Sequence, residues 1–172
     1  MLAKHILPID NDSIVRNFLE NAISNQDIII LDSVSDECRY VSQGIIHQEL
    51  PIIQDSQNIT NTSNIILTVR SHNLLDNNFC YGVQQSRLDA NEFRNRKGAY
   101  LDSADGKIIS YLLHPDDVNE EFIVITEESS SNNDGKVFKK IPLICAELGV
   151  DTVPIINYLT EFNDLTIKLD SV

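Results

Sequence analysis

The chain contains no tryptophan, few glycines and prolines, and half as many basic residues as acidic ones. Six glycines and five prolines in 172 residues are too few for a fibrous or linker-dominated protein. The 13 lysines and arginines against 26 aspartates and glutamates give a formal net charge of −13. Such a charge argues against a surface that binds nucleic acid over its whole extent, because phosphates would be repelled. An acidic metal site or a local basic patch is still compatible with this net charge.

Other missing features exclude further classes of protein. No apolar run approaches the ~18 residues that a membrane-spanning helix needs, so we expect no membrane partner. There is no glycine-rich phosphate loop, no H-E-x-x-H motif and no G-x-S-x-G motif. The cysteines, Cys38, Cys80 and Cys145, are odd in number and far apart, which argues against a disulfide framework or a zinc site. With no secretory signal pattern at the N-terminus, we expect reduced, mostly buried thiols and a cytoplasmic location.

Short apolar runs alternate with segments of helical periodicity. Residues 27–32 and 122–125 are β-branched and continuously apolar, as is typical of strands buried on both faces of a parallel sheet. Helices are predicted at residues 11–25, 83–98, 103–114 and 140–150, with Gly98 as a stop signal for the second of them. This alternation predicts an α/β fold with a mainly parallel sheet between helices, in a single domain that covers residues 1–172.

Several acidic residues follow the predicted strands. Asp10 follows the first apolar run, Glu37 lies on the helix after the strand at 27–32, Glu127 follows the second strand, and Asp105 lies at the start of a helix. The carboxyl ends of parallel strands form the usual functional edge of such a sheet. Carboxylates that converge there repel one another unless Mg²⁺ or Mn²⁺ binds. Ordinary capping of helix N-termini is the structural alternative for the same acids.

Three C-terminal segments carry a family resemblance. They are DSADGKIISYLL, FIVITEES and KKIPLICAELGV. In order and spacing they resemble the D-x-x-L-I-A-x-A, V-V-T-x-E and K-I-P-x-V-C-x-x-L-G-V segments of PIN-domain proteins, in the branch of toxin-type ribonucleases. Upstream, IIILDSVSDEC is similar to the family's strand followed by a Glu-bearing helix, with Glu37 at that glutamate. The resemblance covers more than half of the chain and is poor across residues 45–98.

This resemblance implies a three-layer α/β/α sandwich and metal-dependent cleavage of RNA. It matches Glu37, Asp105 and Glu127 to family acids that hold one or two Mg²⁺ or Mn²⁺ ions. Two registers are open for the family's first catalytic aspartate. In one, Asp10 supplies it, and all four carboxylates form the catalytic and metal site. In the other, the LPID segment follows the family's first strand, the chain lacks that aspartate, and catalysis is lost.

Two groups of basic residues interrupt the acidic background. They are Arg87, Arg94, Arg96 and Lys97 in the first, and Lys136, Lys139 and Lys140 in the second. The second group lies just beyond the predicted metal ligands in sequence, and we expect it to hold RNA phosphates by charge neutralisation. Solvated surface residues are the structural alternative for both groups.

The leading functional hypothesis is a toxin-type ribonuclease that an antitoxin protein neutralises. A catalytically inactive PIN-like module for binding or regulation is the second hypothesis, and an acidic inhibitor that mimics nucleic acid is the third. The partners that follow are an RNA substrate, an antitoxin and, in a homodimer, a second copy of the chain.

Overall fold

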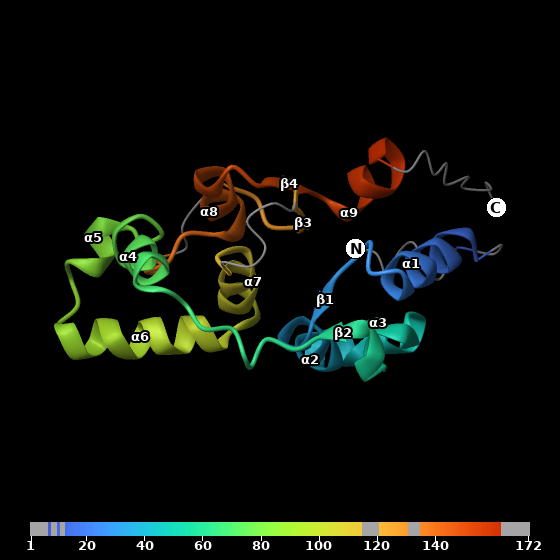
Figure 1. Ribbon diagram of the computed structural model, residues 1–172, viewed down its shortest axis with the longest axis horizontal. Helices are drawn as coiled ribbons and strands as arrows, with labels where there is room; N and C mark the ends of the chain where they lie inside the picture. The colour runs from blue at the N-terminus through green and yellow to red at the C-terminus, as the bar shows by residue number, and fades with distance from the viewer. Residues whose placement is uncertain (1–6, 8–9, 11–12, 115–120, 131–134, 163–172) are drawn as a thin grey trace. The chain divides into compact units, whose positions relative to one another are not determined.

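The computed structural model describes residues 7, 10, 13–114, 121–130 and 135–162 (Figure 1). Its contacts divide the chain into two compact units, residues 1–62 with 155–172 and residues 63–154. Each unit contains one pair of short parallel strands, and helices account for most of the rest. The predicted α/β class with parallel strands is therefore confirmed. The three-layer sandwich and the single domain stay predictions.

The first unit surrounds the strand pair β1 (Ile30–Leu31) and β2 (Ile59–Thr60) with helices. Its helices are α1 (Ile14–Ser24), α2 (Asp32–Tyr40), α3 (Ile45–Glu49) and α9 (Ile155–Asn157). Shorter turns complete it: η3 (Val41–Gly44), η4 (Pro51–Gln54), η5 (Ser56–Asn58) and the π-helical η7 (Tyr158–Phe162). Its core consists of Leu7, Val15, Leu19, Ile23, Leu50, Ile53 and Leu159. Apolar residues at helical spacing in α1 predict one buried side of this helix, and most of them are buried.

The second unit is built on the parallel pair β3 (Ile123–Ile125) and β4 (Asp151–Val153), with Val124 opposite Thr152. Its helices are α4 (Val69–Asn77), α5 (Gly82–Gln85), α6 (Ala90–Asp102), α7 (Ala104–Leu112) and α8 (Ile141–Leu148). The main core is made of Leu75, Phe79, Ile109, Val124, Ile141, Ile144 and Cys145. A second cluster of Cys80, Val137 and Phe138 adjoins α6. The apolar periodicity of α7 and α8 therefore predicted the helices that form this core.

The helix predicted over residues 83–98 is wrong in both its continuity and its end. Helix α5 ends at Gln85, and α6 begins at Ala90 because Asp89 and Glu92 form a capping box there. The Asp89 carboxylate accepts hydrogen bonds from the backbone of Asn91 and Glu92, and Glu92 accepts from the backbone of Asp89. Helix α6 then continues past Gly98 to Asp102. Gly98 lacks the positive φ of a glycine that ends a helix, whereas Gly149 ends α8 with a φ of 74°.

The strands are shorter and more exposed than predicted. Of residues 27–32 only Ile30 and Leu31 are extended, since Asp32 already begins α2. In β3 only Val124 is buried, and Ile123 is 39% exposed within the described structure. Continuous apolar character therefore located the strands but overestimated how fully their two faces are covered.

Two glycines inside neighbouring helices should respond in opposite ways to substitution by alanine. A Cβ atom at Gly98 would meet open space, so Gly98→Ala should raise the free energy of unfolding by about 1 kcal/mol through helix propensity. A Cβ atom at Gly106 would overlap the carbonyl oxygen of Tyr100, so Gly106→Ala should lower the free energy of unfolding. Urea unfolding of both variants beside the parent measures this contrast. A Gly106→Ala protein as stable as the parent would contradict the close packing of α6 and α7.

Candidate functional site

Asp10 caps helix α1. The backbone N–H of Arg16 donates to Oδ2 of the half-buried Asp10, with an N···O distance of 2.9 Å. Ser13, at the N-cap position, makes no capping bond with its side chain and has a φ of 54°. The Arg16 guanidinium pairs with the carboxylate of Glu49 at 2.8 Å rather than with Asp10. The structure thus gives Asp10 the structural role that was the alternative to metal binding.

Glu37 lies on α2 with an exposed side chain. Burial raises the pKa of the thiol of the adjacent residue Cys38, and the negative charge of Glu37 raises this pKa further. Asp10 and Glu37 both belong to the first unit, whereas Asp105 and Glu127 belong to the second. The convergence of these four carboxylates stays a prediction.

Asp32 joins the ends of the two strands in the first unit. Its carboxylate accepts from the backbone N–H of Thr62 at 3.1 Å and from the Thr62 hydroxyl at 2.6 Å. It also accepts from the backbone N–H of Ser33 at 2.8 Å. Thr62 is only 2% exposed, so this carboxylate satisfies donors that water does not reach. A strand-end acid is therefore used here to hold β1 and β2 together.

Asp32→Ala should destabilise the first unit by about 3 kcal/mol, because it leaves the buried donors of Thr62 without an acceptor. Asp36→Ala is the matched control on the same helix, since Asp36 is exposed and only 3.5 Å from Arg39 in a surface pair. Denaturant unfolding of the two variants measures the difference. Equal stability of the two would show that the Asp32–Thr62 contacts contribute nothing.

In the second unit, two carboxylates from separate segments affect the pKa of the buried Tyr100 hydroxyl. Asp105 is in the first turn of α7, and Glu128 follows β3. Burial is the largest cause of the raised pKa of Tyr100, and the charges of Asp105 and Glu128 are among the groups that raise it further. Oε2 of Glu128 also accepts from the backbone N–H of Ile141 at the start of α8, at 3.2 Å. Both carboxylates are half-buried.

Glu128 is the acid after β3 whose charge acts on Tyr100, and the predicted role of its neighbour Glu127 as a metal ligand stays a prediction. Glu127 is exposed. Two signals in the sequence point to Glu128. Alternate residues of a strand share a face, which predicts Glu128 on the side of Val124 if the strand continues. The V-V-T-x-E pattern, aligned on the residues that end in Thr126, also has its glutamate at Glu128.

The Tyr100 hydroxyl is buried and makes no hydrogen bond to any residue that the structure describes. Its ring stacks on Phe138 with the centroids 4.2 Å apart and an interplanar angle of 9°. The stacked ring is well placed, while the polar atom at its tip is unsatisfied among the residues that the structure describes. A buried polar group of this kind calls for an explanation, such as an ordered water or an ion.

Tyr100→Phe separates the ring from its hydroxyl. In the presence of a metal chelator we expect the variant to melt at or above the temperature of the parent, because the stack on Phe138 is kept and an unsatisfied polar atom is removed. Differential scanning calorimetry measures this change. A loss of more than about 1 kcal/mol in chelator would show that the hydroxyl has a strong partner within the folded chain.

The cysteines are free, and Cys80 and Cys145 are buried. Burial raises the pKa of both thiols to about 11; at Cys80 the charge of Asp76 adds to this effect. Both side chains are therefore protonated thiols at neutral pH, which disfavours nucleophilic attack by either of them. This agrees with the prediction of free, mostly buried thiols.

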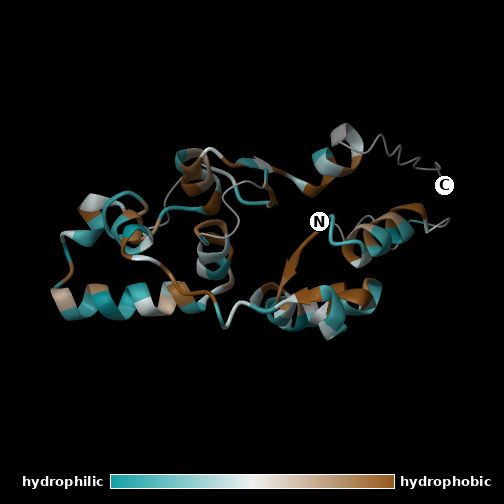
Figure 2. Ribbon diagram, in the orientation of Figure 1, coloured by the Kyte–Doolittle hydropathy of each residue, from teal (hydrophilic) through white to brown (hydrophobic). Residues whose placement is uncertain are grey.

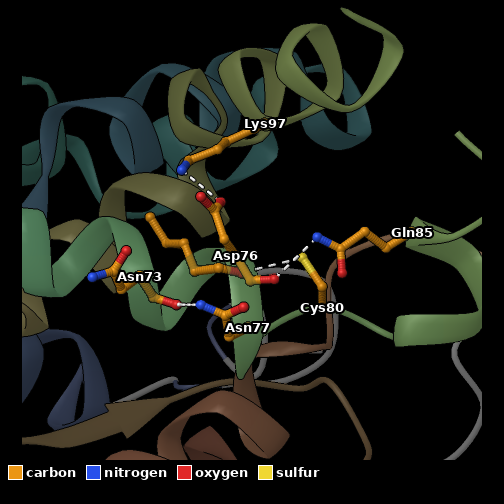
Figure 3. Close-up of polar contacts among 7 residues, drawn as sticks. Asn73, Asp76, Asn77, Cys80, Gln85 and Lys97 are labelled. Atoms are coloured by element: carbon orange, nitrogen blue, oxygen red, sulfur yellow. Dashed lines mark hydrogen bonds and ion pairs between the residues drawn. The ribbon is translucent and has the colours of Figure 1, made fainter. Parts of the chain in front are cut away.

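Lys97 and Lys139, one from each basic group, are held in ion pairs. Lys97 on α6 reaches Asp76 on α4 at 2.5 Å, as Figure 3 shows. The same region is secured by Gln85, whose amide donates to the backbone carbonyl of Asp76 at 3.1 Å. Lys139 pairs with Glu147 at 2.5 Å. These contacts give Lys97 and Lys139 structural partners.

The remaining predicted lysines differ in exposure. Lys136 is exposed, whereas Lys140 is half-buried at the N-cap position of α8. Binding of RNA by Lys136, Lys139 and Lys140 stays a prediction.

Within the described residues, no group of three or more histidine, cysteine, aspartate or glutamate side chains is arranged to hold a metal ion. None of the described helices is both long and apolar enough to cross a bilayer. No family model, curated protein or solved structure matches the chain. The resemblance to PIN-domain proteins therefore stays a prediction that rests on the sequence segments alone.

Proposed function

We propose that this chain is a PIN-like, metal-dependent ribonuclease that hydrolyses RNA phosphodiester bonds. The observation that supports the proposal is the arrangement of Asp105 and Glu128. They come from the start of α7 and the end of β3, and both influence the same buried Tyr100 hydroxyl. In the family that the chain resembles, acids in these two segments belong to the catalytic set.

The donors present suit a hard divalent cation. Carboxylate oxygens are the ligands that Mg²⁺ and Mn²⁺ prefer. Asp105 and Glu128 would hold the ion. A bound ion supplies an activated water and stabilises charge on the leaving oxygen. The half-buried position of both carboxylates limits their motion, which favours a defined ligand geometry.

Lysines near α8 would hold the RNA close to these acids. Lys136 is exposed and can neutralise a phosphate directly. Lys139 would have to leave Glu147, a surface pair of low cost to break. In the toxin-type role, an antitoxin protein would bind the chain and block RNA.

A catalytically inactive PIN-like binding module is the second candidate. It is favoured by the role of Asp10 as a helix cap, because the Asp10 carboxylate accepts a hydrogen bond from the backbone N–H of Arg16. If Asp10 is only a cap, the family's first aspartate has no counterpart here, and RNA or a protein partner would bind without being cleaved.

Asp105→Asn tests the enzymatic proposal. The parent should cleave single-stranded RNA with Mn²⁺ or Mg²⁺, and the variant should lose several orders of magnitude in rate because one ligand of the ion is lost. Mn²⁺ should also raise the melting temperature of the parent by mass action but not that of Asp105→Asn. Gel-based cleavage assays and calorimetry provide the two measurements.

Asp102→Asn is the matched control, because Asp102 is an exposed acid three residues away at the end of α6. It should retain both cleavage and the metal-induced shift. A parent that neither cleaves RNA nor responds to either ion would refute the ribonuclease and leave the binding module.

A further inference from the structure

Helices cover one face of the strand pair β3–β4. Val124 on β3 belongs to the core of the second unit, together with Ile109 of α7 and Ile144 of α8. The ring of Phe122, two residues before Val124, meets the ring of Tyr111 on α7 edge-on, with the centroids 5.8 Å apart. The side chains at positions 122 and 124 therefore face the helices.

The other face of the strand pair carries apolar side chains without such a cover. Alternate residues of a strand share a face, so Ile123 and Ile125 point away from the Val124 side, and Val153 is paired with Ile125 in the ladder. Ile123 is 39% exposed, and Ile125 and Val153 are half-buried. Among the described residues, none of these three belongs to a core cluster or packs against one. We call them the outer sheet face. Figure 2 shows the hydrophobic colour along β3, as is typical of parallel strands that are covered on both faces.

Acidic residues border the outer sheet face. Asp151 is exposed and is paired with Ile123 in the ladder. Glu121 is exposed two residues before Ile123, and Glu127 is exposed two residues after Ile125. The two segments that supply the strands, residues 121–130 and 149–154, contain four carboxylates and no lysine, arginine or histidine. In the part of the chain that the structure describes, neither Glu121 nor Asp151 forms an ion pair.

This acidic border argues against three kinds of occupant. Lys107 and Lys140 do not neutralise it, because they lie on α7 and at the start of α8, which cover the opposite face. The phosphates of a nucleic acid or of anionic lipids would be repelled. Two copies of the chain that met through this face would bring Glu121 and Asp151 close to their own counterparts. Three apolar side chains are also too few for a stable dimer, which buries about 800 Å² on each partner.

A helix with an apolar stripe between basic residues fits the outer sheet face. Helices are the elements that cover parallel strands in α/β proteins. An apolar stripe at i, i+3, i+4, i+7 spacing matches an apolar centre, and long basic side chains on both sides of the stripe can reach acids at the border. Burial of the stripe supplies affinity, while the complementary charges set the orientation and exclude other partners.

We infer that the outer sheet face is a docking surface for a basic amphipathic helix of a partner protein. Ile123, Ile125 and Val153 contact the apolar stripe of that helix, and Glu121 and Asp151 pair with its basic residues. The inference goes beyond the proposed function, because it concerns a protein partner and does not depend on the cleavage of RNA.

Fluorescence anisotropy with labelled synthetic peptides tests the inference on the whole chain. The striped peptide consists of leucine, alanine and lysine, with the leucines at helical spacing and the lysines beside them, and has about 18 residues so that it forms a helix. The shuffled peptide has the same composition and charge but no apolar stripe. The parent protein should bind the striped peptide about 10-fold more tightly than the shuffled one, because only the striped peptide buries its leucines together.

Two variants test the apolar centre. Ile123→Gln should bind the striped peptide about 10-fold more weakly, because it removes an apolar contact. Val83→Gln is the matched control, since Val83 on α5 is 66% exposed and lies outside the outer sheet face. It should bind the striped peptide as the parent does.

Two double variants test the acidic border. Glu121→Gln with Asp151→Asn should bind the striped peptide about 10-fold more weakly at ~0.05 M salt, and with a smaller salt dependence, because two ion pairs are lost. Asp27→Asn with Asp102→Asn removes the same charge from exposed acids elsewhere in the chain. This control should bind nearly as the parent does.

Thiol labelling of Ile123→Cys tests whether the outer sheet face is open in the folded chain. Cys80 and Cys145 are buried, and the parent protein supplies the background from half-buried Cys38. The introduced thiol should react with a maleimide faster than the two buried cysteines do. The striped peptide, unlike the shuffled one, should slow this reaction.

Four results would overturn the inference. The first is an Ile123→Cys thiol that reacts no faster than the buried cysteines, which would show that the face is covered within the folded chain. The others are equal binding of the two peptides, equal binding by Ile123→Gln and Val83→Gln, and equal binding by the two double variants. Peptide binding at this face without any RNA cleavage would refute the ribonuclease and keep the docking surface. RNA cleavage without selective binding of the striped peptide would do the reverse.

Discussion

The close contact between Gly106 and the backbone of Tyr100 determines how the second unit is arranged. Because Gly106 has no side chain, the first turn of α7 can lie against the end of α6. Ser103 secures this junction, since its hydroxyl donates to the carbonyl of Tyr100 at 2.6 Å and accepts from the backbone of Gly106 at 3.2 Å. Asp105 lies within that turn, and its negative charge is one of the causes that raise the pKa of Tyr100. The candidate site thus depends on a packing constraint at a glycine.

Several acidic residues lie where their carboxylates accept hydrogen bonds from backbone N–H groups. Asp10 satisfies the start of α1, Asp89 satisfies the start of α6, and Asp32 links the two strands of the first unit. Glu128 follows the same principle, because it accepts from the backbone at the start of α8. Carboxylates at helix N-termini are stabilised by the helix dipole and by unpaired N–H groups. Glu128 differs from the other three because its negative charge is also one of the causes that raise the pKa of the buried, unsatisfied Tyr100 hydroxyl.

A basic residue also forms a structural contact in the second unit. Lys97 fastens α6 to α4 through Asp76, and the stack of Tyr100 on Phe138 fastens the other end of the helix. These two contacts hold α6 in place although none of its residues is fully buried.

The amino-acid sequence by itself determined the helices α1, α7 and α8, the strand β3, the glycine that ends α8 and the free thiols. Local periodicity, Pro142 near the start of α8 and Gly149 after its end are sufficient for these features, because they depend on neighbours in the chain. Only the tertiary structure decided that Gly98 continues a helix and that Asp10 caps α1. It also decided that the Glu128 carboxylate accepts a hydrogen bond from the backbone at the start of α8. Each of these outcomes depends on which backbone or side-chain group the residue contacts. That group is either distant in sequence or separated from the residue by a turn, and the sequence pattern does not specify the geometry of the turn. The same physical reason applies to Gly106, whose role becomes visible only when the carbonyl of Tyr100 occupies the space where a side chain would be.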